Sequence, residues 1–479
     1  TAQGQAVGLL CFVPHSDMAD GASSYAIFRC HHIIYATGGP AAMYAESVYP
    51  GVHFGASGLA FEAGAQGRNL TEWQYGLASV RPRWNVSGTY MQVRPRFISL
   101  DTDGGDEKEF LMDFFTGYPE MLSKVFMKGY QWPFDVRKVM DQSSIIDILV
   151  YAEQKKGRRV FLDFRSNPGG EDIDFSSLDA EARDYLQKAE ACFGTPFERL
   201  SHMNRPAVDF YLAHGVDLSS EPLEIALCAQ HNNGGLGVDC WWQTSLPGLF
   251  AAGEVAGTHG VYRPGGTALN AGQVGSQRAS QYISRKGNTG VPDPASIGYL
   301  CMSQIEEMVA LGQQAVDRSQ PENARNILST VSREMSLVAG PFRRLPQLEA
   351  FLEKIDGYLA DFSSEVHVGQ ESTLSWVFRL RDVLLSQKMY VSAMIDYIRK
   401  GGQSRGSALY TDPEGQLPKG LAEDFRFVED TGEKNSLVQE MKYEAGACQA
   451  QWRTVNPLPE DDSFFENVWR LYRENQNIW

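Results

Sequence analysis

The sequence predicts an α/β fold with three parts: a Rossmann-like domain built from two separated segments, an α+β capping domain inserted between them, and a C-terminal helical bundle. Three observations predict it. A strand that runs into glycines occurs twice, at residues 23–39 and 246–254. Between about 81 and 225 the composition turns richer in aromatic and charged residues. From 298 to 400 the apolar residues repeat with helical spacing.

These observations set the expected boundaries. We expect the Rossmann-like domain over 1–80 and 226–290, the capping domain over 81–225, the helical domain over 291–410 and a C-terminal tail region over 411–479. Within them, the local patterns predict strands at 6–12, 23–39 and 159–164, and helices at 55–67, 178–193, 267–285 and 371–400.

Three local signals give finer expectations. Ser319 to Glu322 read "SQPE", a capping box that marks the start of a helix. Pro346 is expected to open another helix. His31 and His32 are neighbours on an expected strand, so their side chains are predicted to point to opposite faces.

Charge and cysteine usage exclude several classes of protein. The chain has 43 basic and 59 acidic residues and a net charge of −16, which opposes nucleic-acid binding. No apolar run reaches the roughly 18 residues of a membrane-spanning helix, so direct membrane insertion is not expected. Seven cysteines without C-x-x-C spacing argue against a metal site and favour reduced thiols in a cytoplasmic protein. The chain starts at Thr1 without a signal peptide, so this start is interpreted as a trimmed boundary.

Two glycine stretches carry the expected cofactor chemistry. The first, A-T-G-G, lets the backbone approach a flat ligand, although a tight turn explains it equally well. In the second, Glu254 follows a strand and a glycine and could accept a hydrogen bond from a ribityl or ribose hydroxyl. The N–H groups near Thr267 open a helix and favour partial negative charge, such as the N1/O2 edge of a flavin. The expected cofactor-binding residues are Ala36, Thr37, Gly38, Gly39, Gly253, Glu254, Gly266, Thr267, Ala268 and Leu269.

The order of these motifs resembles that of the succinate dehydrogenase/fumarate reductase flavoprotein family, which includes L-aspartate oxidase. A-T-G-G, G-L-F-A-A-G-E and H-G-x-x-R-x-G-G-x-x-L occur in the family's order, and residues 55–75 and 401–406 resemble two further family motifs. The resemblance implies an FAD/NAD(P)-binding Rossmann-like domain and FAD as cofactor. The family's G-x-G-x-x-G, which cradles the FAD pyrophosphate, is expected to precede Thr1.

The substrate end departs from the family. Gly76, Leu77 and Ala78 replace the family's H-P-T, and Phe134 stands where R-D-V has its proton-shuttling arginine. Arg137 lies further along and is expected to face elsewhere. In the loop that matches H-x-T-M-G-G, Gln230 takes the histidine's place and His231 follows it. One carboxylate clamp therefore remains, and we expect a substrate other than succinate.

The expected catalytic residues each have a structural alternative. Arg263, framed by glycines, favours a functional role over a structural ion pair. His259 is evenly balanced, because it could only satisfy a loop carbonyl. His231, beside two asparagines, could belong to a turn. A substrate-facing role for His231 and Gln230 is favoured only because the matching family loop lines the site. Arg405 is expected to anchor the helical domain.

Three functions are compatible with the sequence. The first is an FAD-dependent oxidoreductase that acts on an organic small molecule, expected to bear a carboxylate. The second is a flavin electron-transfer subunit with an iron–sulfur partner. The third is a scaffold that retains the fold without an active site. Flavin in the purified protein would reject the third, and a co-purifying iron–sulfur subunit would favour the second.

Overall fold

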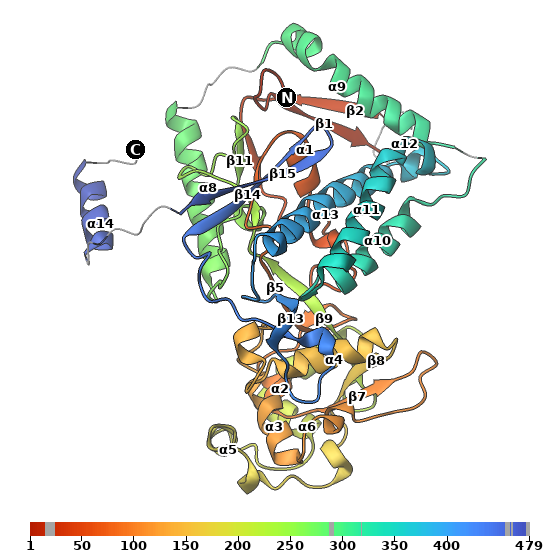
Figure 1. The fold of residues 1–479 in the computed structure, drawn as a ribbon, viewed down its shortest axis with the longest axis vertical. Helices are drawn as coiled ribbons and strands as arrows, with labels where there is room; N and C mark the ends of the chain where they lie inside the picture. The colour runs from red at the N-terminus through yellow and green to blue at the C-terminus, as the bar shows by residue number, and fades with distance from the viewer. Residues whose placement is uncertain (15–23, 287–291, 318, 456–459, 461–462, 476–479) are drawn as a thin grey trace.

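The structure is a computed structural model, and it describes the chain except residues 15–23, 287–291, 318, 456–459, 461–462 and 476–479. Figure 1 shows two lobes along the longest axis of the molecule. The upper lobe holds the N-terminal strands and the long helices, and the lower lobe holds residues from the middle of the chain. None of the helices in the described ranges is long and apolar enough to cross a membrane.

The two strand-and-glycine stretches pair with one another. β3 (Ile33–Tyr35) and β11 (Leu249–Ala251) run parallel, with Leu249 opposite Ile33. Because the two strands are parallel, their carboxyl ends lie at one edge, so the glycines that follow both strands meet there. The predicted α/β organisation is confirmed at this point. α1 (Ser57–Glu62) and α8 (Thr267–Lys286) follow these strands, near the predicted 55–67 and 267–285.

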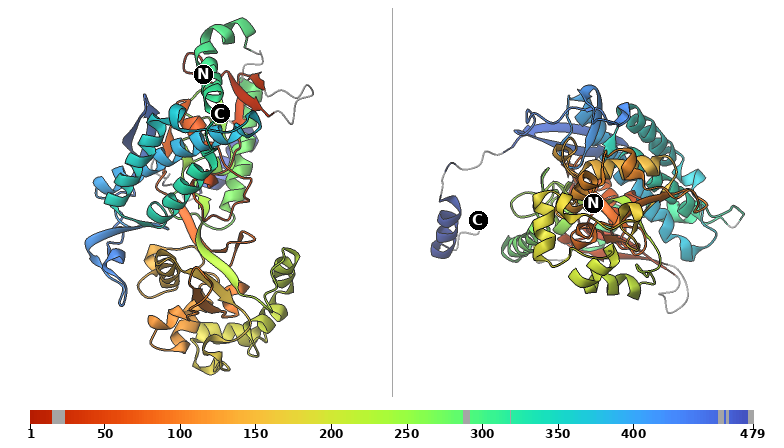
Figure 2. Two further views of the ribbon diagram at one scale, coloured as in Figure 1. Left: turned by 90° about the vertical axis from the view of Figure 1, so that its right-hand side faces the viewer. Right: turned by 90° about the horizontal axis from the view of Figure 1, so that it is seen from below.

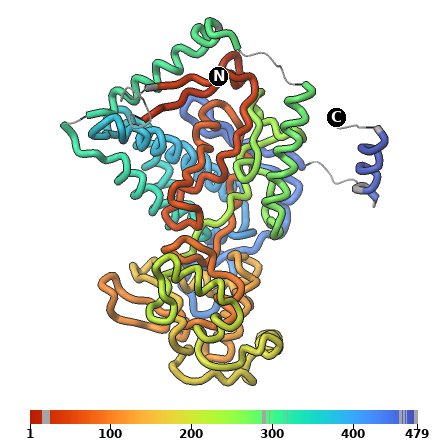
Figure 3. The backbone as a smooth tube through the Cα atoms, turned by 180° about the vertical axis from the view of Figure 1, so that it is seen from behind, coloured from red at the N-terminus to blue at the C-terminus, as the bar shows by residue number. Residues whose placement is uncertain are grey.

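The strand expected over 23–39 is two strands. Its first residue, Ser23, lies outside the described residues. β2 (Ser24–Arg29) forms an antiparallel pair with β1 (Gly8–Val13), whereas β3 pairs with β11. The chain changes partner between them, and His31 and His32 lie in this break rather than on a strand. The prediction that they face opposite sides of a strand is therefore wrong. Figure 3 shows the β1–β2 hairpin beside α9 (Pro294–Ala315) at one end of the molecule.

A five-stranded sheet connects the lobes, in the order β6-β5-β9-β8-β7. β5 and β9 are its longest strands, and Figure 2 shows them running from the upper lobe into the lower one. The expected boundary at 80 falls just after β5 and the one at 226 falls inside β9, and the division into domains stays a prediction. The strands are β5 (Trp73–Ser79), β6 (Trp84–Asn85), β7 (Arg96–Leu100), β8 (Arg159–Asp163) and β9 (Leu223–Asn232).

The lower lobe covers this sheet with short helices. The helix expected over 178–193 is shorter, and a separate helix follows it because Thr195 and Glu198 form a capping box there. The helices of this lobe are α2 (Thr89–Gln92), α3 (Tyr118–Met127), α4 (Ile145–Lys155), α5 (Ala180–Lys188), α6 (Pro196–Met203) and α7 (Arg205–Ala213).

The helical region packs around one central helix, α13 (Ser375–Arg399), whose buried face contacts α1, α10 and α11. Pro346 lies in the first turn of its helix, as predicted. The expected capping box at Ser319 is wrong. Ser319 donates from its N–H and hydroxyl to Asp317 Oδ1 in a local turn, and the next helix begins only at Ala324. The helices are α10 (Ala324–Val338), α11 (Leu345–Ala360) and α12 (Phe362–Glu365).

The C-terminal region contains strands that the sequence analysis missed. β14 (Leu437–Glu444) and β15 (Ala447–Thr454) form a hairpin, and β14 also pairs with β4 (Gly67–Arg68), which in turn pairs with β10 (Gly235–Leu236). The turn residues Ala445 and Gly446 both have positive φ, as a two-residue hairpin turn requires. This dipeptide was the signal in the sequence for the hairpin. The other elements are β12 (Phe342–Arg343), β13 (Leu409–Gln416) and α14 (Phe464–Asn475).

Candidate functional site

The site begins where β3 and β11 end. Gly39 follows β3, and a Cβ atom at Gly39 would lie 2.5 Å from Oε1 of Glu254, which follows β11. A side chain at residue 39 would therefore displace the Glu254 carboxylate from this position. The first glycine stretch is therefore more than a tight turn, because it makes room for a side chain from the second stretch.

The Glu254 carboxylate is held by its neighbours. Asn232 donates its backbone N–H to Oε1 at 2.7 Å, and the Tyr49 hydroxyl donates to the same oxygen. Burial raises the pKa of Glu254. His53 stacks on Tyr49 with ring centroids 5.3 Å apart, and its Nε2 lies 3.0 Å from the Gly39 carbonyl oxygen. Both hydrogen bonds to Glu254 fall on Oε1, so the proposed ribose or ribityl contact would use the other oxygen.

A β-bulge brings Gln230 and His231 to one face of β9. His231 pairs with Gln74 and Ala229 pairs with Tyr75, so Gln230 is the extra residue. The side chain of Gln230 lies against Gly76, two residues from Gln74 and on the same face of β5. In a regular strand these two neighbours would point in opposite directions. The bulge therefore lets both expected site residues face the same side.

Arg263 lies on this face. Its Nε and Nη2 donate to Gln74 Oε1 at 2.9 and 2.6 Å. The rings of His231 and His259 pack edge to face with their centroids 4.7 Å apart. Nδ1 of His231 lies 2.9 Å from Asn233 Oδ1. The structure thus brings together Arg263, His231, His259 and Gln230 around the β5–β9 bulge.

Both histidines of this cluster are held neutral. Burial, with a further contribution from the Arg263 cation, lowers the pKa of His231 to about 3 and that of His259 to about 4. The neighbouring His259 also contributes to the shift at His231. An amide oxygen cannot donate, so His231 Nδ1 carries the proton towards Asn233. Its Nε2 therefore presents a lone pair.

Helix α8 begins beside this cluster. Gly266 has a φ of 81°, and the Thr267 hydroxyl donates to the Pro264 carbonyl at 2.7 Å. The first N–H groups of a helix lack intrahelical acceptors and carry partial positive charge. Leu269, one of the expected cofactor-binding residues, lies in the first turn of α8 and is 79% exposed. A cavity of about 400 Å³ extends along this end of the helix, lined by Trp242, Thr258, His259, Pro264, Thr267, Asn270, Ala271 and Val274.

Leu77 and Phe134, two of the residues that depart from the family motifs, carry no polar group into the cluster. Leu77 is fully buried, and Phe134 is buried against Phe342 with ring centroids 5.1 Å apart. Arg137 is closer to the site than expected. Its guanidinium pairs with Asp135 at 2.7 Å and lies 3.8 Å over the ring of Tyr262. The 3-10 helix that carries Arg137 turns it towards the loop that holds Arg263.

The sequence analysis missed two residues of the site. Gln74 holds Arg263, and Tyr49 holds Glu254. The period of two along β5 places Gln74 on the same face as Gly76, so this strand pattern was a usable signal for Gln74. No local pattern singles out Tyr49, because its contact with Glu254 joins residues 205 positions apart.

Several buried polar atoms of the site have no hydrogen-bond partner among the described residues. They are Thr37 Oγ1, both side-chain polar atoms of Gln230, His231 Nε2, and both ring nitrogens of His259. Buried polar groups are normally satisfied, so such a cluster is expected where a ligand binds. With the glycine-lined strand ends and the start of α8, these atoms fit a bound flavin and an anionic substrate. The individual roles of these residues stay predictions.

The comparisons with known proteins agree with the predicted family. The model of a family described as the FAD binding domain matches residues 15–269, more than half of the chain. The L-aspartate oxidase of Caulobacter vibrioides is 25% identical over 299 residues, which cover 62% of this chain and 47% of that protein. The fumarate reductase (CoM/CoB) of Methanothermobacter marburgensis has one polypeptide that is 51% identical over 70 residues, or 14% of this chain and 13% of that polypeptide. The chain thus spans less than half the length of these relatives.

Solved structures share the fold over nearly the whole chain. A quinol-fumarate reductase with menaquinol molecules matches with a TM-score of 0.64 at 17% identity, covering 96% of this chain and 72% of that one. Sdh1 of Mycobacterium smegmatis in complex with UQ1 matches with a TM-score of 0.66 at 16% identity, covering 99% of this chain and 69% of that one. The predicted fold class is confirmed by these matches.

Proposed function

Because the chain belongs to the FAD-binding family of succinate dehydrogenase and fumarate reductase flavoproteins, we propose that it acts in an FAD-dependent oxidoreductase whose substrate is an organic carboxylate other than succinate. One observation carries the proposal. Arg263 is oriented by the neutral side chain of Gln74 beside two neutral imidazoles, so its positive charge remains free to bind an anion.

Residues at the strand ends and at the start of α8 would hold the cofactor. A Cβ atom at Gly253 would meet nothing within 4 Å, so the backbone there leaves room for a flat ring system, whereas Gly38 and Gly39 admit the side chains of His53 and Glu254. The N–H groups of Ala268 and Leu269 favour the partial negative charge of the ring. Bound FAD supplies hydride transfer to or from the substrate.

The cluster around Arg263 would bind and orient the substrate. The planar guanidinium of Arg263 binds a carboxylate through two parallel hydrogen bonds. His231 Nε2, with its lone pair, accepts a hydrogen bond from a hydroxyl or amine on the same substrate. Since the pKa of His231 is about 3, this nitrogen stays unprotonated at neutral pH.

A second carboxylate clamp is lacking at the positions that match the family's clamp. Gly76, Leu77 and Ala78 offer no charged or hydrogen-bonding side chain, and the buried Phe134 offers none either. A 1,4-dicarboxylate would leave one carboxylate without its charge-assisted partner. A site built for polar pairing discriminates by roughly 10⁴ to 10⁵, so succinate and fumarate are expected to be poor substrates.

The proposal is tested with Arg263→Lys in protein expressed from its complete coding sequence. Lysine keeps the charge but loses the planar fork. We expect unchanged flavin content and turnover lower by roughly 10² or more, the scale of losing one transition-state donor. Arg205→Lys, at an exposed ion pair with Asp209, is the matched control and should leave turnover unchanged.

Three results would contradict the proposal. Turnover that is unchanged in Arg263→Lys removes Arg263 from the substrate site. Flavin lost together with activity makes Arg263 a structural residue. Rapid fumarate reduction or succinate oxidation by the wild-type protein shows that a second clamp exists elsewhere. An iron–sulfur partner stays a prediction, and it is checked by whether such a protein co-purifies.

A further inference from the structure

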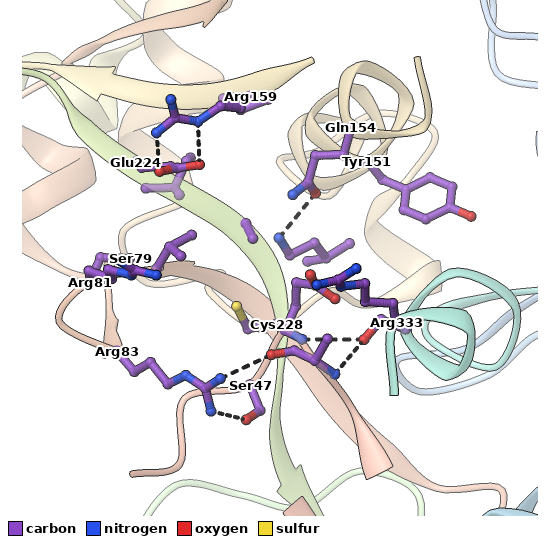
Figure 4. A pocket seen from close by; sticks show the side chains of 18 of the residues that line it. Ser47, Ser79, Arg81, Arg83, Tyr151, Gln154, Arg159, Glu224, Cys228 and Arg333 are labelled. Atoms are coloured by element: carbon purple, nitrogen blue, oxygen red, sulfur yellow. Dashed lines mark hydrogen bonds and ion pairs between the residues drawn. The ribbon is translucent and has the colours of Figure 1, made fainter. Parts of the chain in front are cut away.

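A second cavity lies at the junction of the lobes, on the strand that carries the flavin-site residues. It has a volume of about 650 Å³, within the usual range for small-molecule sites. Figure 4 shows it around β9, with Cys228 near its centre. Its walls come from the end of β5, the segment 45–47, α4, β8 and α10. We call it the β9 groove. Among the described residues, its lining does not include Arg263, His259, His231 or Gln230.

The groove carries uncompensated positive charge. Five arginines line it, and two of them are paired: Arg158 with Asp106 and Glu153, and Arg159 with Glu224. The other three are Arg81, Arg83 and Arg333. Within the described part of the chain, no carboxylate lies within ion-pair distance of these three. Glu46 is the one lining acid without an ion pair there, so the groove keeps a net positive charge.

Arg83 is held in place without being neutralised. Its guanidinium donates to Ser47 Oγ at 3.2 Å, to the Ala45 carbonyl at 3.2 Å and to the Tyr49 carbonyl at 3.3 Å. All three acceptors are uncharged. A cation that is fixed by neutral acceptors is oriented in advance for an anion, so binding costs less side-chain entropy.

Hydrogen bonds join the walls of the groove to one another. Ser336 Oγ on α10 accepts the backbone N–H groups of Ala45 and Glu46. Ala229 and Val48 complete backbone hydrogen bonds between β9 and the same segment. The groove is therefore formed by connected elements from both lobes.

The rest of the lining is largely apolar. Val80, Ala226 and Leu337 contribute hydrocarbon surface, and Leu337 is 48% exposed. Cys228 is buried, and burial raises the pKa of its thiol, so it remains neutral. The Tyr151 hydroxyl is already bound to the Leu337 carbonyl. The groove thus offers an apolar floor beside three cations.

We propose that the β9 groove binds an organic anion that has an apolar body and a carboxylate or phosphate group, at a site separate from the flavin site. The anionic group lies towards Arg81 and Arg83, which lie on the same side of Cys228 in Figure 4, and the apolar body lies on Val80, Cys228 and Leu337. This site does not depend on the redox function, because its residues are distinct from those of the Arg263 cluster.

The test is isothermal titration calorimetry of the purified protein with three naphthalene probes. 1-Naphthyl phosphate and 1-naphthoate carry the two candidate anions, and 1-naphthalenemethanol is their neutral counterpart. The anions are expected to bind at least about tenfold more tightly than the alcohol, a difference typical of one charge-assisted contact. The tighter of the two anions identifies which group the site prefers.

Two variants report on the groove by different routes. Arg83→Gln removes a cation but also loosens the segment 45–49. Leu337→Glu adds a negative charge at a half-exposed side chain and removes no hydrogen bond. Both are expected to weaken the better anion by about tenfold or more. The control Arg205→Gln, at an exposed pair in α7, should bind the anion like the wild type.

Equal affinity for the anions and the alcohol would overturn the proposal. So would Leu337→Glu with wild-type affinity in a protein that retains its melting temperature. Flavin content and turnover of Leu337→Glu should match the wild type, which separates failure of this site from failure of the proposed function.

Discussion

Arg263 donates two hydrogen bonds to a single oxygen, Oε1 of Gln74, one from Nε at 2.9 Å and one from Nη2 at 2.6 Å. A carboxylate in the same position would also orient the guanidinium, but it would cancel its charge. The carboxamide orients Arg263 and leaves the charge available. We therefore expect the identity of residue 74 to control whether Arg263 binds an anion.

This relationship predicts the effect of Gln74→Glu. The new carboxylate would neutralise Arg263, so the affinity for a carboxylate substrate should fall by about tenfold or more. Flavin content should not change. Binding is measured by titrating the visible absorption of the flavin with a panel of mono- and dicarboxylates. Gln187→Glu, an exposed position on α5, serves as the charge control. Unchanged affinity in Gln74→Glu would show that Arg263 does not bind the carboxylate.

The two site histidines should stay neutral throughout the range from pH 5 to pH 8. Burial lowers the pKa of His231 to about 3 and of His259 to about 4, so neither ring should titrate between pH 5 and 8. Nitrogen-15 NMR of histidine-labelled protein checks this, with His231→Gln and His259→Gln to assign the signals. In Arg263→Gln both pKa values should rise, because the Arg263 cation lowers both. A ring that titrates near pH 6.5 would contradict the burial of that ring.

The lowered pKa values of His231 and His259 also determine in which direction the stability of the protein changes with pH. An unfolded histidine has a pKa of about 6.5, above the folded values, so the unfolded chain binds more protons below that pH. The stability that these rings contribute is complete above pH 6.5 and is lost as the pH falls towards 4. His259→Gln should therefore flatten the fall of the melting temperature between pH 6.5 and 4. If the melting temperature of His259→Gln falls with pH as steeply as that of the wild type, this account is contradicted.

A buried ion pair joins distant parts of the chain. Arg405 Nε and Nη2 donate to Glu72 Oε1 at 3.0 and 2.9 Å, with side chains 9% and 3% exposed. Glu72 also accepts the N–H groups of Asn233 and Gly234 through its backbone carbonyl. Arg405→Met should destabilise by about 3–5 kcal/mol, because it leaves a buried charge unpaired.

The double variant tests this reason. Adding Glu72→Gln to Arg405→Met removes the stranded charge, so it should recover part of the lost melting temperature. Calorimetric unfolding of the wild type, both single variants and the double variant gives the coupling. Simple additivity of the two single changes would show that the pair does not interact.

Arg94 predicts a stabilising substitution. Its side chain is fully buried, lies 4.6 Å over Phe175, and has no hydrogen-bond acceptor in the described part of the chain. Burial, and then the neighbouring Arg199, lowers the pKa of Arg94 to about 9. Arg94→Met keeps the volume and removes the buried charge, so the change should be neutral or stabilising by about 1–4 kcal/mol.

Arg199→Met is the matched control. Arg199 is equally buried, but it donates to the Val93 and Phe193 carbonyls and to Asn167 Oδ1, so its loss strands three acceptors. The melting temperature should fall in Arg199→Met and not in Arg94→Met. A similar fall in both would mean that Arg94 has a partner of its own.

Local sequence was sufficient where a pattern is closed within a few residues. The strand, glycine and helix order over 246–285 predicted a strand where β11 lies and a helix that begins at Thr267, as α8 does. Arg263 and His259 were identified because glycines frame them. The buried stripe of α13 followed from its apolar spacing. These features depend on backbone freedom and on periodicity, which are local properties of the chain.

The tertiary structure decided which residues meet. The stretch 23–39 has one continuous strand pattern, yet it splits because β2 and β3 find different partners. The bulge that brings Gln230 beside His231 exists only through the register of β9 against β5. Gln74 reaches Arg263 across 189 positions of the sequence. Strand partners, register and contacts of this kind are set by packing of the whole chain, and no local periodicity encodes them.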